Sequence, residues 1–209
     1  MNVPRSGLGA PETRGFPELI PVDAPPELER FATAVRRLQD LAVSTKPNGE
    51  TWTAATDAIE SACAALEPHQ VPDGQAPAGR AVKLPGLGHP LMPPWTITAF
   101  DADGVTMEGH FSRFHVGGNM AVHGGVIPLL YDWHFGMIVS AAGRPISRTG
   151  YLHVDYRAVT PIDAPLISRG RIDRIDGRKA FVTAIMTDAD GTVLSEANGL
   201  MIKLLDHQP

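Results

Sequence analysis

The sequence of 209 residues contains a single cysteine, Cys63, and this scarcity limits both its covalent and its metal chemistry. One cysteine cannot form a disulfide within the chain, and it cannot supply the paired thiolates of a cysteine-based zinc site. The histidines lack metal-ligand spacing, because His110 and His115 fall in a strand-like stretch and would point to opposite faces. We therefore expect a cytoplasmic protein that uses neither a metal nor a cofactor.

Clusters of basic residues and long apolar runs are also missing. The chain has 18 lysines and arginines against 23 acids, and aspartates interrupt each basic stretch, which argues against nucleic-acid binding. The longest apolar run, 126–142, carries Asp132 and His134 near its centre and is too short and too polar to span a membrane. The first thirty residues contain no apolar stretch of the kind that a signal peptide needs.

Proline, in contrast, is concentrated between residues 68 and 94, where the composition of the chain changes. Seven prolines in these 27 residues predict an extended connector that is draped over the next domain. Before it, apolar residues recur at helical spacing in two stretches, one from Leu28 to Leu41 and one from Trp52 to Leu66. We therefore divide the chain into a helical extension with its connector, 1–94, and a second domain, 95–209.

Residues 95–209 have the pattern of an antiparallel sheet with one helix. Asp-Gly dipeptides at 103–104, 176–177 and 190–191 favour tight hairpins, because they supply the backbone angles that such turns require. They separate expected strands at 95–101, 105–115, 149–159, 165–175, 178–188 and 192–204. The stretch 125–142 is apolar nearly all round and predicts one long helix buried on several sides, with Pro128 in its first turn. The fold class is therefore α+β.

A single carboxylate, Asp132, interrupts this apolar helix in the stretch NMAVHGGVIPLLYDWHFG, 119–136. A helix that starts at Gly124 or Gly125 presents unpaired amides and a positive dipole end, which can hold a developing oxyanion. Asp132 lies on nearly the same face as Gly125 but about 10 Å along the helix axis. One carbonyl cannot touch both, so the spacing favours a dimer in which the acid of one copy meets the amide of the other.

Two interpretations of Asp132 fit the residues alone. A carboxylate in an apolar wall is poorly hydrated and reactive, which suits a general base or a nucleophile. Alternatively it pairs with a buried donor such as Trp133 or His134 and only holds the core together. His123 taken alone is more typical of a structural residue at a helix start than of a catalytic one.

Three segments in combination resemble the hotdog-fold acyl-CoA thioesterases, of the phenylacetate-degradation (PaaI) type and the animal thioesterase superfamily. They are HGGVIPLLYD, TGYLHVDYRAVTP and IDGRKAFVTAIMTDADGTVLSEANGLMIKL, within residues 95–205. The resemblance implies a hotdog fold, an antiparallel sheet wrapped around one long helix, and hydrolysis of an acyl-CoA thioester to free acid and CoA. It also implies homodimers with sites at the interface, often paired again into tetramers.

The resemblance implies a role for each residue that matches the motif. The Gly124 amide would polarise the thioester carbonyl, and Asp132 would act as general base or nucleophile. Thr149 would hold the acid or the attacking water, and His123 would orient the loop or the thioester.

Candidate substrate contacts lie beside the helix start and in the basic stretch 168–179; they are Asn119, Gly125, Arg178 and Lys179. Guanidinium groups bind phosphates well, so cations of this stretch are candidates for the phosphates of CoA. The alternative, which we favour, is a solvated strand face with Asp173 and Asp176 as partners.

The sequence departs from the family pattern at Gly117, where many PaaI-type enzymes have an asparagine. Asn119 is two residues out of register, so either the loop is rearranged or a substrate contact is absent. A non-catalytic acyl-CoA-binding protein is therefore the alternative function, and a hotdog hydratase fits less well because its acid is arranged differently. A carrier-protein thioester is an alternative substrate, and the extension could cap the sheet, cover an acyl tunnel or add a dimer contact.

Overall fold

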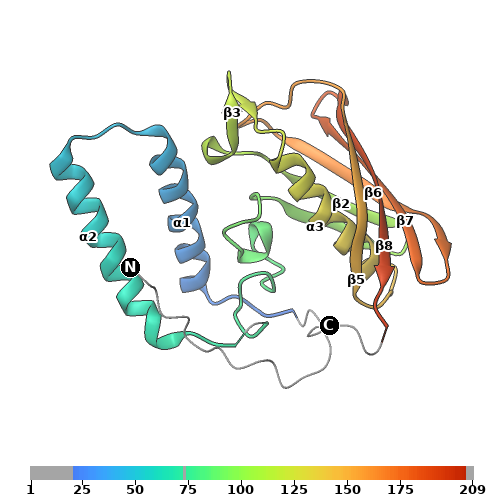
Figure 1. Cartoon of the computed structure of the whole chain (residues 1–209), viewed down its shortest axis with the longest axis horizontal. Helices are drawn as coiled ribbons and strands as arrows, with labels where there is room; N and C mark the ends of the chain where they lie inside the picture. The colour runs from blue at the N-terminus through green and yellow to red at the C-terminus, as the bar shows by residue number, and fades with distance from the viewer. Residues whose placement is uncertain (1–20, 73, 206–209) are drawn as a thin grey trace.

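The computed structural model of the protein describes residues 21–72 and 74–205 (Figure 1). Residues 1–20, on which most of the signal-peptide expectation rests, lie outside the described residues. Two helices come first, α1 (Pro26–Ser44) and α2 (Gly49–Leu66), as the apolar spacing predicts. A connector then leads to a sheet with one helix on its face, so the α+β prediction is confirmed.

The connector between α2 and the sheet is turned rather than extended, so this prediction was wrong in its conformation. It contains the short turns η1 (Glu67–His69) and η2 (Pro85–Gly88). The Gly86 amide donates to the Trp95 carbonyl over 2.7 Å, and Leu87 packs into the core. Burial of Ala81, Leu84 and Leu87, with the bonds around them, holds the proline-rich stretch on the domain, over which it was expected to lie.

The six-stranded sheet is antiparallel throughout, in the order β1-β2-β6-β7-β8-β5. Its strands are β1 (Thr96–Asp101), β2 (Gly104–Gly109), β5 (Ser147–Tyr156), β6 (Leu166–Asp176), β7 (Lys179–Asp188) and β8 (Val193–Lys203). Each Asp-Gly dipeptide lies at a hairpin between two of these strands, as predicted. β1 and β5 form the two edges of the sheet.

The expected strand 105–115 was wrong beyond residue 109. β2 ends at Gly109, where an added side chain would collide with Trp95, and the chain turns through η3 (Arg113–His115). The Ser112 amide donates to the His115 ring over 3.0 Å, which stabilises this turn. A small hairpin follows, β3 (Val116–Gly118) and β4 (Ala121–Val122), so His110 and His115 do not share a strand.

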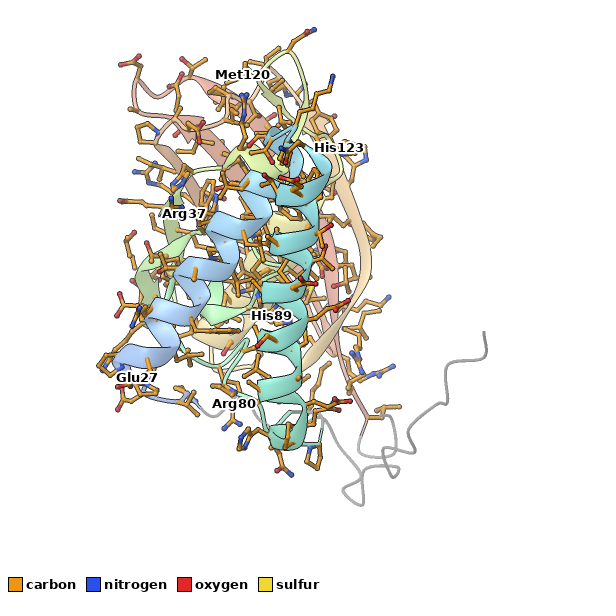
Figure 2. The ribbon with its side chains drawn as sticks, turned by 90° about the vertical axis from the view of Figure 1, so that its left-hand side faces the viewer. Glu27, Arg37, Arg80, His89, Met120 and His123 are labelled. Atoms are coloured by element: carbon orange, nitrogen blue, oxygen red, sulfur yellow. The ribbon has the colours of Figure 1, made fainter. Side chains whose placement is uncertain are left out.

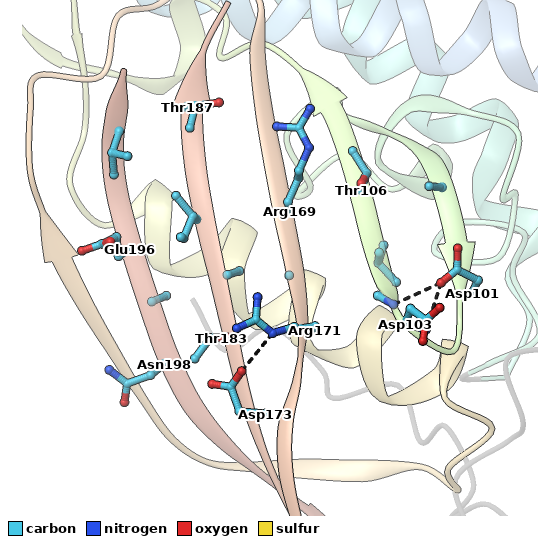
Figure 3. A pocket seen from close by; sticks show the side chains of 18 of the residues that line it. Asp101, Asp103, Thr106, Arg169, Arg171, Asp173, Thr183, Thr187, Glu196 and Asn198 are labelled. Atoms are coloured by element: carbon cyan, nitrogen blue, oxygen red, sulfur yellow. Dashed lines mark hydrogen bonds and ion pairs between the residues drawn. The ribbon is translucent and has the colours of Figure 1, made fainter. Parts of the chain in front are cut away.

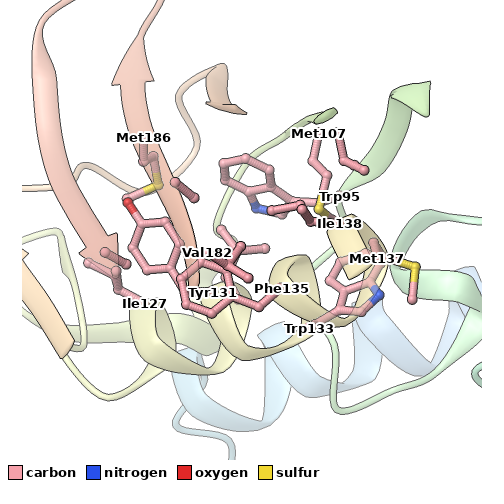
Figure 4. Close-up of a cluster of buried hydrophobic side chains, with 14 of the residues drawn as sticks. Trp95, Met107, Ile127, Tyr131, Trp133, Phe135, Met137, Ile138, Val182 and Met186 are labelled. Atoms are coloured by element: carbon pink, nitrogen blue, oxygen red, sulfur yellow. The ribbon is translucent and has the colours of Figure 1, made fainter. Parts of the chain in front are cut away.

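The helix α3 (Val126–Ala141) packs on one face of the sheet and supplies much of the core (Figure 4). It begins after Gly125, as predicted, and the large side chains that flank Asp132 are buried: Tyr131, Trp133, Phe135 and Met137. The fully buried His134 ring bridges two strands, through Nδ1 to the Ser168 hydroxyl (2.9 Å) and Nε2 to the Val105 carbonyl (3.0 Å).

Candidate active site

Asp132 lies on the outward side of α3, in contact with the edge strand β5. Its carboxylate is exposed in the single chain, although its neighbours in the helix are buried. The Thr149 hydroxyl donates to Asp132 Oδ1 over 2.6 Å. An irregularity at Gly150 shifts the register of β5 against β8 after Thr149, and such a bulge re-aims the neighbouring side chain. The structure therefore brings together the acid and the hydroxyl of the sequence motif.

Trp133 and His134, the two buried donors that could have paired with Asp132, form no hydrogen bond with it. His134 is bonded to Ser168 and Val105 in the core, and Trp133 Nε1 has no hydrogen-bond partner among the described residues. The expectation that the carboxylate sits in an apolar wall was also wrong for a single chain, because Asp132 lies beside the edge strand β5 and is open to solvent. Its exposure leaves one carboxylate oxygen accessible to a ligand or a water.

The start of α3 leaves one backbone amide unpaired. The Gly125 amide donates to Nδ1 of His123 over 3.0 Å, so this ring nitrogen is taken up by the start of the helix. The Gly124 carbonyl accepts from the Tyr156 hydroxyl over 2.7 Å. Within residues 21–72 and 74–205, the Gly124 amide donates to no acceptor, and the residue is exposed. It can therefore donate to a bound carbonyl oxygen beside the positive end of the helix.

The loop before the motif histidine is tightly packed at Gly117, the position at which many PaaI-type enzymes have an asparagine. Gly117 lies so close to His123 that an added Cβ would come within 2.7 Å of its Cα. An asparagine at this position would therefore push the histidine out of place. Asn119 stands at the tip of the β3–β4 hairpin with a positive φ of 50°, and its side chain is exposed.

Arg178 and Lys179 lie far along the sheet from the start of α3. They form the β6–β7 turn, and Arg178 donates to the Lys203 carbonyl over 3.1 Å. β8 pairs Lys203 with Ser147, at the opposite end of β5 from Tyr156. The structure therefore does not bring these cations to Gly124 of the same chain.

Other cations of the basic stretch have the partners expected of a solvated strand face. Arg171 pairs with Asp173 at 3.2 Å and Arg174 with Asp176 at 3.9 Å, and all four side chains are well exposed. The Arg174 guanidinium also stacks over the Phe181 ring at 3.9 Å.

A depression of about 910 Å³ lies on the opposite face of the sheet, away from α3 (Figure 3). Its lining mixes apolar and polar side chains, and several of the charged ones are bonded; Asp101 accepts from the amides of Asp103 and Gly104, and Arg171 pairs with Asp173. None of the residues that line it belongs to the motif around Asp132. Alternation along the strands predicts this outward face. Its concavity comes from the twist of the whole sheet, which the sequence does not specify.

The part of the chain that the structure describes contains neither a cluster of metal ligands nor a membrane-spanning helix. No group of three or more potential ligand side chains is placed to hold a metal ion. No helix among the described residues combines the length and the hydropathy that a membrane span requires.

Comparison with solved structures places the protein in a known fold. A thioesterase superfamily protein of known crystal structure is 24% identical and superposes with a TM-score of 0.74, covering 88% of this chain and 93% of that one. A hypothetical thioesterase from Streptococcus pneumoniae, solved with coenzyme A, is 18% identical over 52% of this chain and 86% of its own, with a TM-score of 0.50. The fold is the hotdog fold, and the first match extends beyond residues 95–209 into the N-terminal extension.

Sequence comparison narrows the resemblance to acyl-CoA thioesterases. Acyl-coenzyme A thioesterase THEM4 of Rattus norvegicus is 33% identical over 89 residues, which are 42% of this chain and 38% of that protein. Its counterpart in Mus musculus is 30% identical over the same shares. The match thus spans well under half the length of these curated relatives. No family model matches the chain. The resemblance to the hotdog-type thioesterases that the motifs indicated is confirmed.

Proposed function

We propose that the protein hydrolyses an acyl-CoA thioester at a site that two copies of the chain build together. The observation that carries the proposal is the 2.6 Å bond from Thr149 to an exposed Asp132, at the edge of the sheet. A carboxylate that is both oriented and open to solvent suits attack on a bound carbonyl, whereas a purely structural acid has its oxygens engaged in the core. The names of the curated relatives support the choice of substrate class.

The geometry of β5 supports a shared site. Tyr156 of this strand holds the Gly124 carbonyl, and Thr149, seven residues earlier, holds Asp132. β5 is an edge strand, so a second copy can pair with it in antiparallel register. A two-fold axis between residues 152 and 153 would set Thr149 of one copy opposite Tyr156 of the other. Asp132 of one copy would then approach the unpaired Gly124 amide of its partner.

The chemistry of such a site divides between the two copies. The thioester carbonyl oxygen accepts from the Gly124 amide, which stabilises the negative charge that develops on attack. Asp132 either removes a proton from a water that adds to the carbonyl carbon, or adds through its own carboxylate to give an anhydride that water then cleaves. In both routes the carbon–sulfur bond breaks, and the CoA thiolate leaves and takes up the proton. His123 positions the loop by capping the Gly125 amide.

The test is release of CoA thiol from a panel of acyl-CoAs, short, long and aromatic, by wild type and Asp132→Asn. Asparagine keeps an oxygen that can accept from Thr149, so the fold stays intact while the basic and nucleophilic oxygen is lost. We expect turnover to fall by roughly a hundredfold or more, as for loss of a positioned general base. Ser140→Ala, two turns further on the exposed side of α3, is the control and should match wild type. Equal turnover by Asp132→Asn would refute the proposal.

A single turnover in water enriched in ¹⁸O tests for attack by the carboxylate. Label in the Asp132 side chain indicates attack by the carboxylate, followed by addition of water to the aspartyl carbonyl of the anhydride. Label only in the released acid indicates that water adds to the acyl carbonyl, either of the thioester itself or of the anhydride.

The departure from the family pattern at Gly117 favours one second candidate, a non-catalytic acyl-CoA-binding protein. Gly117 leaves no room for the asparagine of many PaaI-type enzymes, so one substrate contact of that family has no counterpart at this position. Measurable binding of an acyl-CoA without thiol release, in wild type and in Asp132→Asn alike, would favour this candidate.

A further inference from the structure

The helix α2 stands apart from the rest of the chain (Figure 1), and Figure 2 shows it with α1 in front of the remaining elements. Every residue of α2 except Ala55 is exposed, and no residue of either N-terminal helix is buried. An isolated helix of this length is only marginally stable in water, so α2 requires a surface to pack on.

α2 carries an apolar stripe suited to packing on another helix. Trp52, Ile59 and Leu66 recur every seven residues, with Ala55 and Ala62 between them. This alternating three- and four-residue spacing is the pattern of helices that pack side by side at a shallow angle. The three large side chains are 46%, 41% and 51% exposed, so the stripe is uncovered in a single chain.

α1 has two different sides. One side faces the domain, where Arg36 donates to the carbonyls of Met92, Pro85 and His89 at 2.7 to 3.1 Å. The other side presents a second uncovered stripe, and its large members are Phe31, Leu38 and Leu41. Residues 45–48 join the two helices, so each chain offers a helical hairpin with one apolar stripe on each helix. Such a hairpin is half of a four-helix bundle.

The charges of the two helices lie outside their apolar stripes. Arg30 and Arg37 lie on one exposed side of α1, seven residues apart, and form no ion pair among the described residues. α2 carries three acids, Glu50, Asp57 and Glu60, on the sides away from its stripe, and no lysine or arginine. The α1 stripe of one copy can therefore pack on the α2 stripe of another without burying these charges, and the reciprocal contact follows from two-fold symmetry. The acidity of α2 is unlike the basic faces of helices that bind membranes.

The apolar area is sufficient for a specific contact. The large exposed side chains of the hairpin amount to on the order of 600 Å² per chain, near the roughly 800 Å² per partner of a standard interface. From these observations we propose that the α1–α2 hairpins of two copies pack together as a four-helix bundle, the α1 stripe of each on the α2 stripe of the other. This contact is separate from β5 and does not depend on the proposed hydrolysis.

The test compares two double variants of the full chain. Ile59→Glu with Leu66→Glu places charges in the α2 stripe, and Thr53→Glu with Ala64→Glu places the same charges on the opposite side of the same helix. Sedimentation equilibrium over a concentration series measures the assembly. The labelling rate of Cys63 by a maleimide reports cover on α2, because this only cysteine lies one turn from Ile59.

We expect the stripe variant to have a dissociation midpoint at a concentration at least tenfold higher than that of wild type. Its Cys63 should react with the maleimide several-fold faster. The control variant should match wild type in both measurements. Faster labelling with an unchanged mass profile would mean that α2 is covered by its own chain, and it would overturn the proposal. Identical behaviour of all three proteins in both measurements would overturn it as well. A wild type that floats with phosphatidylcholine vesicles, with the same mass profile as the stripe variant, would assign the stripe to lipid instead.

Discussion

His134 is a titratable side chain that is fully buried in the core. Burial lowers the pKa of its imidazole to about 4, although the bond to the Val105 carbonyl favours the charged form. In the unfolded chain the pKa of a histidine is about 6.5. Between these two pKa values the folded state binds fewer protons than the unfolded state. The contribution of His134 to the unfolding free energy is therefore complete above about pH 6.5 and is lost as the pH falls towards 4.

We therefore predict that the wild type loses up to about 3 kcal/mol of unfolding free energy between pH 7 and pH 4 through this one residue. Urea denaturation of wild type and His134→Asn at a series of pH values measures the loss. The variant is expected to be less stable at neutral pH but to show the smaller decline. Parallel pH profiles of the two proteins would contradict the assignment.

At the scale of residues, the sequence motif identifies both partners of the shortest contact in the site, Asp132 and Thr149. It does not give the exposure of Asp132, which depends on which side of α3 faces the sheet. It also leaves open why Gly117 replaces an asparagine, because the close approach of His123 is set by the β3–β4 pairing. The bond from Tyr156 to Gly124 joins residues 32 apart in the chain, and only the folded sheet places them together.

At the scale of elements, Arg36 fixes α1 to the domain. Its guanidinium is shared among three backbone carbonyls of the connector, and the nearby Gly86 has no side chain that would collide with it. Partial burial lowers the pKa of Arg36 from its usual value, while Asp40 opposes that shift. The group nevertheless stays charged at any ordinary pH.

We predict that Arg36→Met releases α1 from the connector and lowers stability by roughly 1.5–3 kcal/mol, the contribution of hydrogen bonds from a charged group. Hydrogen exchange of the α1 amides and limited proteolysis between 45 and 48 should both accelerate. Arg37→Met, one residue further and exposed, is the control. Unchanged exchange in α1 of the Arg36 variant would show that other contacts hold the helix.

The elements with strong local signals were predicted within about three residues of their observed ends, because hairpin dipeptides and apolar periodicity are properties of the chain itself. The failures, in contrast, depend on distant residues. β2 ends early because Gly109 packs against Trp95. The connector folds back because Arg36 and the core bind it. No local pattern contains either contact.

At the scale of the whole molecule, the proposed site takes its amide from one copy and its acid from the other. Mixing two inactive variants tests this arrangement. Asp132→Asn lacks the acid, and Gly124→Pro lacks the amide, so each homodimer is expected to be inactive. After unfolding and refolding together, half of the dimers are mixed, and each mixed dimer holds one intact site. We predict recovery of about a quarter of wild-type turnover, as follows from the symmetry of a two-fold dimer.

The control for this experiment refolds each variant alone, and neither should regain activity. Absence of recovery in the mixture, despite mixed dimers detected by mass, would mean that the acid and the amide of one chain serve the same site.

The spacing of Thr149 and Tyr156 on β5 has a consequence for how the protein can change over time. Under the proposed function these residues set, on one strand, how far the acid of one copy lies from the amide of the other. Side chains between them can be exchanged, but a gain or loss of one residue there would displace both sites of a dimer at once. The tip of the β3–β4 hairpin is free of this requirement. Length variation among descendants of this chain should therefore accumulate at the hairpin tip and be purged from the strand.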